Sequence, residues 1–131
     1  MKPLDEAGKI LLRQWLDKAD KDLAVAKHLL NAGYNEAVGF HSQQAAEKYL
    51  KAYLVRRQVD FPKTHDLGKL LELVATVDAR LAESLAEADD LTDFGVEIRY
   101  PGDLPELSAD EAKGAVELAE KVLAAVSPAL L

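Results

Sequence analysis

The chain has 131 residues and a formal net charge of −7, because its 23 acidic residues outnumber its 16 Lys and Arg. Cysteine is absent, which excludes disulfide frameworks, thiolate metal sites and cysteine nucleophiles. The negative charge argues against extended, sequence-independent binding to nucleic acid, because phosphate affinity comes from Lys and Arg. We expect a single domain over residues 1–131 that lies in a reducing cytoplasm, with no metal, no cofactor and no membrane segment.

Apolar residues recur at three- and four-residue steps in the first half of the chain, which predicts two long helices. The first is expected over residues 9–31 and stops before Gly33. The second is expected over residues 35–58, with Asn35 as its N-cap. Its apolar residues spread around most of its circumference, which is typical of a helix at the centre of a bundle.

The next part of the chain predicts a short helix and a longer one. The short helix follows Thr64, its expected N-cap, and carries four apolar residues between positions 67 and 74. Asp78 is expected to cap the fourth helix, which Pro101 ends because the residue before a proline avoids the helical region.

A capping-box pattern, Ser108 with Glu111, predicts the start of a fifth helix that runs to Pro128. No stretch of the sequence reads as a convincing strand. The predicted fold class is therefore all-α, an up-and-down bundle of four longer helices plus one short helix.

The second helix keeps one polar sector. Steps of three, four and three residues place four polar side chains on one stripe: His41, Gln44, Lys48 and Lys51. The stripe is either the solvated face of a partly buried helix or a surface that binds an anion or a partner. Spacing alone leaves both interpretations open.

Charge is unevenly distributed along the chain. Residues 44–69 hold six basic and three acidic residues, whereas residues 82–120 hold twelve acidic and two basic ones. A separation of this kind suits self-association or a basic partner protein, and a solvated acidic face is the alternative.

Motifs that would assign a common enzyme class are missing. The sequence holds no P-loop, Rossmann, nucleophile-elbow or HExxH motif, and no histidine has the spacing from Glu that marks di-iron bundles. Of the three histidines, His28 is expected to be structural, whereas the loop position of His65 keeps it a candidate. Arg99 either complements the helix dipole at the C-terminus of the fourth helix or binds phosphate.

Three separated motifs carry a family resemblance. They are the run AVGFHSQQAAEKYLKA at residues 37–52, PKTHDL at residues 62–67, and Arg99-Tyr100-Pro101. Together they resemble the HEPN domain (higher eukaryotes and prokaryotes nucleotide-binding), from about residue 15 to the fifth helix. The resemblance implies a helical bundle that is commonly a homodimer. It also implies a small prokaryotic protein that pairs with a minimal nucleotidyltransferase in a toxin–antitoxin-like system.

The stripe and the resemblance together predict the binding residues. A nucleotide, or the nucleotidyltransferase, is expected to bind through His41, Gln44, Lys48, Lys51, His65, Arg99 and Tyr100. The alternative function is a metal-independent HEPN ribonuclease, which has a His four to six residues after an Arg. Arg99 fits the first position but Leu104, Pro105 and Glu106 fill the second, so catalysis would need His41 or His65 beside Arg99.

Overall fold

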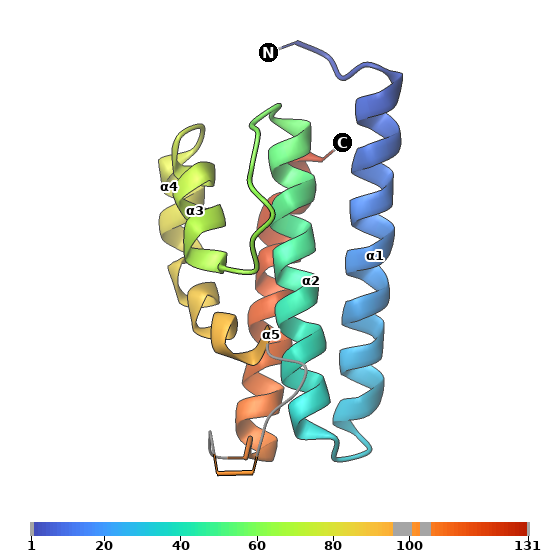
Figure 1. Ribbon diagram of the computed structural model, residues 1–131, viewed down its shortest axis with the longest axis vertical. Coiled ribbons are helices and arrows are strands. Elements are labelled where there is room, and N and C mark those ends of the chain that lie inside the picture. The colour runs from blue at the N-terminus through green and yellow to red at the C-terminus, as the bar shows by residue number, and fades with distance from the viewer. Residues whose placement is uncertain (1, 96–100, 103–105, 131) are drawn as a thin grey trace.

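A computed structural model of the protein describes residues 2–95, 101–102 and 106–130, and these residues form helices without strands. In chain order the α-helices and 3₁₀ helices are α1 (Glu6–Leu30), α2 (Asn35–Arg56), α3 (Leu67–Ala75), α4 (Ala79–Ser84), η1 (Ala86–Gly95), α5 (Ala109–Val126) and η2 (Ser127–Ala129). The long helices α1, α2 and α5 run alongside one another, and α3, α4 and η1 cover the side of α2 away from α1 (Figure 1). The predicted all-α bundle is confirmed.

α2 is the central helix, as its apolar composition predicted. It packs against α1, α3, α5 and η1. Five of its large apolar side chains are fully buried: Val38, Tyr49, Leu50, Tyr53 and Leu54. Full burial of each such side chain contributes about 1.5–3 kcal/mol relative to exposure. The helix that carries the polar stripe is therefore firmly fixed in the core.

Two of the predicted N-caps are wrong. Asn35 lies inside α2, and its side-chain amide donates to the Leu107 carbonyl at 3.1 Å, which ties the start of α2 to the segment before α5. Thr64 does not cap α3, because its hydroxyl accepts from the Asp66 N–H at 3.1 Å. Asp66 is the cap, and its carboxylate accepts from the Lys69 N–H.

The fourth predicted helix is divided into an α-helical and a 3₁₀ part. Asp78 caps α4 as predicted, but α4 ends at Ser84 and the chain continues as η1. From the end of α4, buried apolar side chains recur every three residues: Leu85, Ala88 and Leu91. This step matches the 3.0 residues per turn of a 3₁₀ helix. The predicted end of this helix falls on residues 96–100, which lie outside the described residues.

The fifth helix begins as predicted. The Ser108 hydroxyl accepts from the Glu111 N–H at 3.0 Å, and the Glu111 carboxylate accepts from the Ser108 N–H at 3.1 Å. The two bonds form the predicted capping box and satisfy two backbone donors at the N-terminus of α5.

The buried phenol of Tyr49 should make the protein less stable at alkaline pH. Its hydroxyl donates to the Asp20 carboxylate on α1 at 2.6 Å, and burial together with this contact raises the pKa of Tyr49 well above its usual value of 10.0. Above about pH 10 the unfolded chain releases this proton while the folded chain keeps it, so the free energy of unfolding falls. Urea unfolding at pH 8 and pH 11 should show a smaller fall for Tyr49→Phe than for the wild type; an equal fall contradicts this assignment.

Candidate functional site

His41 and Lys48 of the predicted stripe share one carboxylate. Asp22, on α1, accepts from Nδ1 of His41 at 2.9 Å and from Nζ of Lys48 at 2.5 Å, one bond to each oxygen. The three side chains are 13–28% exposed. We call this group the Asp22 triad; it links α1 to α2 and remains in reach of solvent.

Lys51, the last residue of the stripe, shares a second carboxylate with His65. Glu47 lies one turn before Lys51 on α2, and it accepts from Lys51 Nζ at 2.9 Å and from His65 Nδ1 at 2.8 Å. The side chains of Glu47 and Lys51 are only 2% and 7% exposed, whereas that of His65 is 75% exposed. This Glu47 triad therefore connects a buried ion pair to an imidazole at the surface.

Two glutamine amides extend the Glu47 triad. Gln44, part of the stripe, donates to the side-chain oxygen of Gln43 at 2.7 Å. Gln43 is fully buried and donates to both the Glu47 carboxylate and the His65 carbonyl, each at 3.1 Å. Gln43 thus fixes the carboxylate that holds the imidazole and also the backbone of the loop that carries it.

Two aromatic rings flank the buried ammonium of Lys51. Its Nζ lies 5.2 Å from the ring centre of Trp15 and 6.0 Å from that of Phe61, and the two rings meet edge to face. Aromatic faces attract a cation, so the rings and Glu47 act on the same charge. Lys51 is a predicted ligand residue, and the structure places it beneath the surface rather than on it.

Both carboxylates orient their imidazoles in the same way. An ionised carboxylate only accepts hydrogen bonds, so Nδ1 of His41 and of His65 must carry the shared proton. In the neutral ring Nε2 is then an acceptor, and in the imidazolium it is a second donor. Each triad is neutral with a neutral histidine and carries +1 with a charged one. The stripe is therefore no free basic patch, and its affinity for an anion depends on the histidines.

Asp22, Gln43 and Glu47 belong to the candidate site, and the sequence did not single them out. Gln43, Glu47 and Lys51 follow each other at four-residue steps, so helical spacing was a usable signal for two of them. Asp22 gave no such signal, because its partner His41 is on the next helix, 19 residues away.

The remaining predicted site residues, from the third motif, cannot be placed relative to the triads. Arg99 and Tyr100, with positions 104 and 105 of the incomplete ribonuclease motif, fall outside the described residues. Within the described ranges, no three side chains of metal-ligating type form a cluster. No helix in those ranges is long and apolar enough to span a bilayer.

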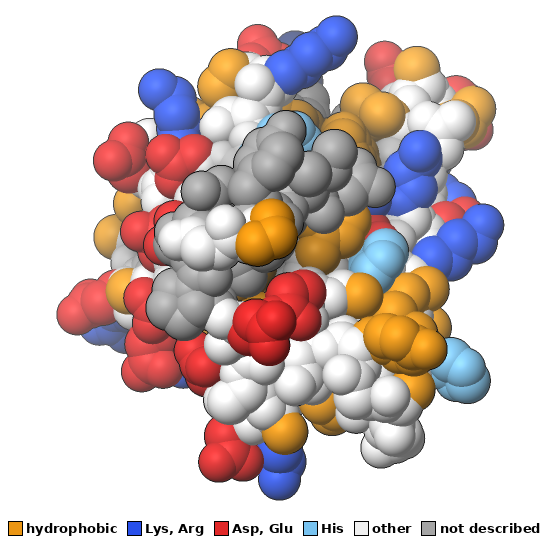
Figure 2. Space-filling model, turned by 60° about the horizontal axis from the view of Figure 1, so that its bottom comes forward, with side chains coloured by type: hydrophobic (Ala, Val, Ile, Leu, Met, Phe, Trp, Pro, Cys, Tyr) orange, Lys and Arg blue, Asp and Glu red, His pale blue; other side chains and the backbone are white. Residues whose placement is uncertain are grey.

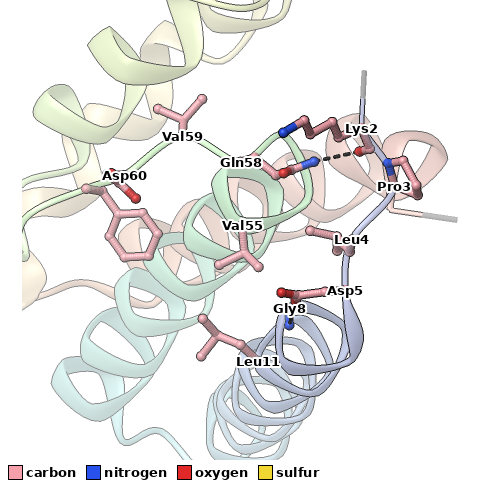
Figure 3. Close-up of a pocket in the computed structure, with 11 residues that line it drawn as sticks. Lys2, Pro3, Leu4, Asp5, Gly8, Leu11, Val55, Gln58, Val59 and Asp60 are labelled. Carbon is pink, nitrogen blue, oxygen red and sulfur yellow. Dashed lines mark hydrogen bonds between the residues drawn. The ribbon is translucent and has the colours of Figure 1, made fainter.

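A cavity of about 750 Å³ lies at the C-terminal end of α2, between the N-terminal segment and the loop after α2 (Figure 3). Leu4, Leu11 and Val55 line it, and Gln58 donates to the Lys2 carbonyl at 2.6 Å across it. None of its lining residues belongs to either triad. Its charged lining residues are Lys2, Asp5 and Asp60, so it lacks the cationic surplus that a phosphate site needs.

The sequence model of the HEPN domain family matches residues 12–128. The chain belongs to this family. A crystal structure of TT1696 from Thermus thermophilus is similar, with 31% identity over 91% of this chain and 98% of that chain and a TM-score of 0.70. ST0689, an archaeal HEPN homologue, shares the fold at 23% identity over the whole of both chains, also with a TM-score of 0.70. No curated protein matches the chain significantly.

In this HEPN domain two of the three motifs that carried the resemblance also supply residues of the triads. The run at residues 37–52 supplies the histidine, lysine and glutamine side chains of α2 together with Glu47. The PKTHDL run supplies His65. Asp22 comes from α1, upstream of both motifs.

Proposed function

We propose that this HEPN domain binds the phosphate groups of a nucleotide through His41 and His65. The Glu47 triad carries the proposal, because a buried carboxylate and a buried lysine hold an imidazole that is 75% exposed. Burying an ion pair costs several kcal/mol, and apolar residues of similar size in its place often stabilise the fold equally or more. The stability of the core therefore does not explain the buried Glu47–Lys51 pair, whereas the orientation of the His65 ring does.

A phosphate group suits the second ring nitrogen, Nε2, of each imidazole, because Nδ1 is already bonded to a carboxylate. A protonated imidazole donates from Nε2 and forms a charge-assisted hydrogen bond to a phosphate oxygen. His41 and Glu47 are six residues apart on α2, about 9 Å along the helix axis. His41 and the carboxylate that holds His65 therefore lie on different turns of α2, so the proposed ligand carries more than one phosphate group. Gln44, Lys48, Arg99 and Tyr100 complete the proposed site, with the Arg99 guanidinium as a bidentate phosphate ligand.

The proposal includes protein partners. We expect a cytoplasmic, toxin–antitoxin-like pair with a minimal nucleotidyltransferase, as the family resemblance implies. We also expect a homodimer. Exposed apolar side chains on α1 support self-association: Ile10, Leu11 and Val25, at 59%, 43% and 38% exposure.

Calorimetric titration with ATP, GTP and CTP tests the nucleotide site. The wild type should bind at least one of them, and His65→Ala and Lys48→Ala should each weaken binding about ten-fold, which is about 1.4 kcal/mol. His28→Ala is the matched control, because His28 is exposed on α1 and belongs to neither triad. Arg99→Ala should weaken binding in the same way, and Arg80→Ala on α4 should not. Absence of binding by the wild type, or equal losses in the controls, would contradict the proposal.

A metal-independent ribonuclease is the second candidate, favoured by the tautomer that the carboxylates impose. With Nδ1 bonded to Glu47, the Nε2 lone pair of a neutral His65 can accept a proton from a ribose 2′-hydroxyl. Arg99 would then bind the scissile phosphate. RNA cleavage in the presence of EDTA should be lost in His65→Ala and Arg99→Ala and kept in His28→Ala. An inactive wild type on varied RNAs would exclude this function.

A further inference from the structure

A groove of about 460 Å³ lies between η1 and α5, and none of its lining residues belongs to a triad. Its apolar floor is buried or half-buried and consists of Phe94, Ala115 and Leu118. Exposed carboxylates line its rim: Glu87 and Asp90 from η1, Glu111 and Glu117 from α5. The groove therefore has acidic residues on two facing elements with apolar surface between them.

Negative charge surrounds the groove. Lys121 is the one basic residue of its lining, against four carboxylates. Acidic side chains gather on one side of the molecule, and most of the visible Lys and Arg side chains lie toward the other (Figure 2). A ligand rich in phosphate would be repelled here, whereas a cationic one would be attracted.

Gly114 keeps one wall of the groove open. It lies in α5 among the lining residues, and a Cβ added there would meet nothing within 4 Å. A larger side chain at this position would project into free space rather than clash. The floor therefore has room for an apolar side chain from outside the molecule.

We propose that this groove is the docking site for a basic amphipathic helix of a partner protein. Its apolar stripe would pack on Phe94 and Leu118, and Lys or Arg on either side of that stripe would pair with the two acidic rims. The charge pattern of the occupant follows from the charge pattern of the groove. This inference goes beyond nucleotide binding and does not depend on it.

A second copy of this chain is a poorer occupant. Of its sixteen Lys and Arg, six lie between positions 44 and 69 and five lie on α1, and several in both groups already pair with side chains of the same chain. Lys48 and Lys51 pair with carboxylates, and Arg57 donates to the Tyr53 hydroxyl. A partner protein that brings its own cations fits the groove better.

A labelled Leu/Lys amphipathic peptide of about 14 residues, or four helical turns, provides the probe. Fluorescence anisotropy should show binding to the wild type, and no binding of the same peptide with Glu in place of Lys. Gly114→Leu should weaken binding about ten-fold or more by filling the groove, and so should the triple variant Glu87→Gln, Asp90→Asn, Glu117→Gln. Circular dichroism would confirm that both variants fold.

A charge-matched triple variant provides the control: Glu6→Gln, Asp17→Asn and Glu72→Gln remove three exposed carboxylates elsewhere. It should bind the peptide like the wild type. Peptide affinity that is unchanged by Gly114→Leu, or lowered equally by the control, would overturn the proposal. Sedimentation velocity tests the other occupant: a wild-type dimer that Gly114→Leu dissociates would show that a second copy fills the groove, and would also overturn it.

Discussion

Replacing Glu47 with alanine should lower the free energy of unfolding by about 3–5 kcal/mol, because it leaves the buried ammonium of Lys51 without its carboxylate. Lys51 is only 7% exposed, so water cannot readily replace the lost acceptor. The Trp15 and Phe61 rings contact the ammonium in the wild type as well, so they do not replace the lost carboxylate. Urea unfolding followed by circular dichroism measures the difference.

Two controls separate the buried charge from the loss of the side chain itself. The double variant Glu47→Leu, Lys51→Met should recover most of the stability, because apolar replacement of a buried ion pair is often nearly neutral. Asp17→Ala removes an exposed pair with Arg13 on α1 and should cost less than about 1 kcal/mol. A loss as small as this in Glu47→Ala would show that Glu47 does not hold a buried charge.

Gly95→Ala should lower the free energy of unfolding by about 1–3 kcal/mol through overpacking. The added Cβ would lie 2.9 Å from Cδ and 3.0 Å from Oε1 of Gln43. Gln43 cannot move away without losing its bonds to Glu47 and to the His65 carbonyl. The substitution should therefore also disturb the ring environment of His65, visible in its NMR signals.

Gly114→Ala is the matched control, because its Cβ meets nothing within 4 Å. Removal of glycine from inside a helix should raise the free energy of unfolding by about 0.5–1 kcal/mol. Opposite signs for the two substitutions in the same urea assay are expected. A neutral Gly95→Ala would mean that Gln43 is free to rearrange and does not fix the Glu47 triad.

Helical periodicity predicted the bundle because the buried face of each helix follows from the local spacing of its apolar residues. The central place of α2 followed from apolar residues around most of its circumference. The caps were harder, because Asn35 and Thr64 are good capping residues that bond elsewhere in the fold. The 3₁₀ helix η1 was missed, although its buried residues keep a step of three from Leu85 to Leu91.

The polar stripe on α2 was visible in the sequence, but its charge balance was not. Asp22 reaches His41 and Lys48 from another helix, and His65 reaches Glu47 from a loop. Such contacts depend on tertiary packing, which spacing along one helix does not encode. Once they are included, the stripe changes from a basic surface into two neutralised triads, each of which holds one histidine.

Imidazole NMR during a titration with ATP tests nucleotide binding at the triads most directly. The chain has three histidines, and His28 on α1 serves as an internal control. Added ATP should shift the ring signals of His41 and His65 and leave those of His28 unchanged. Unchanged signals from His41 and His65 at saturating ATP, or a shift confined to His28, would contradict a nucleotide site at the triads.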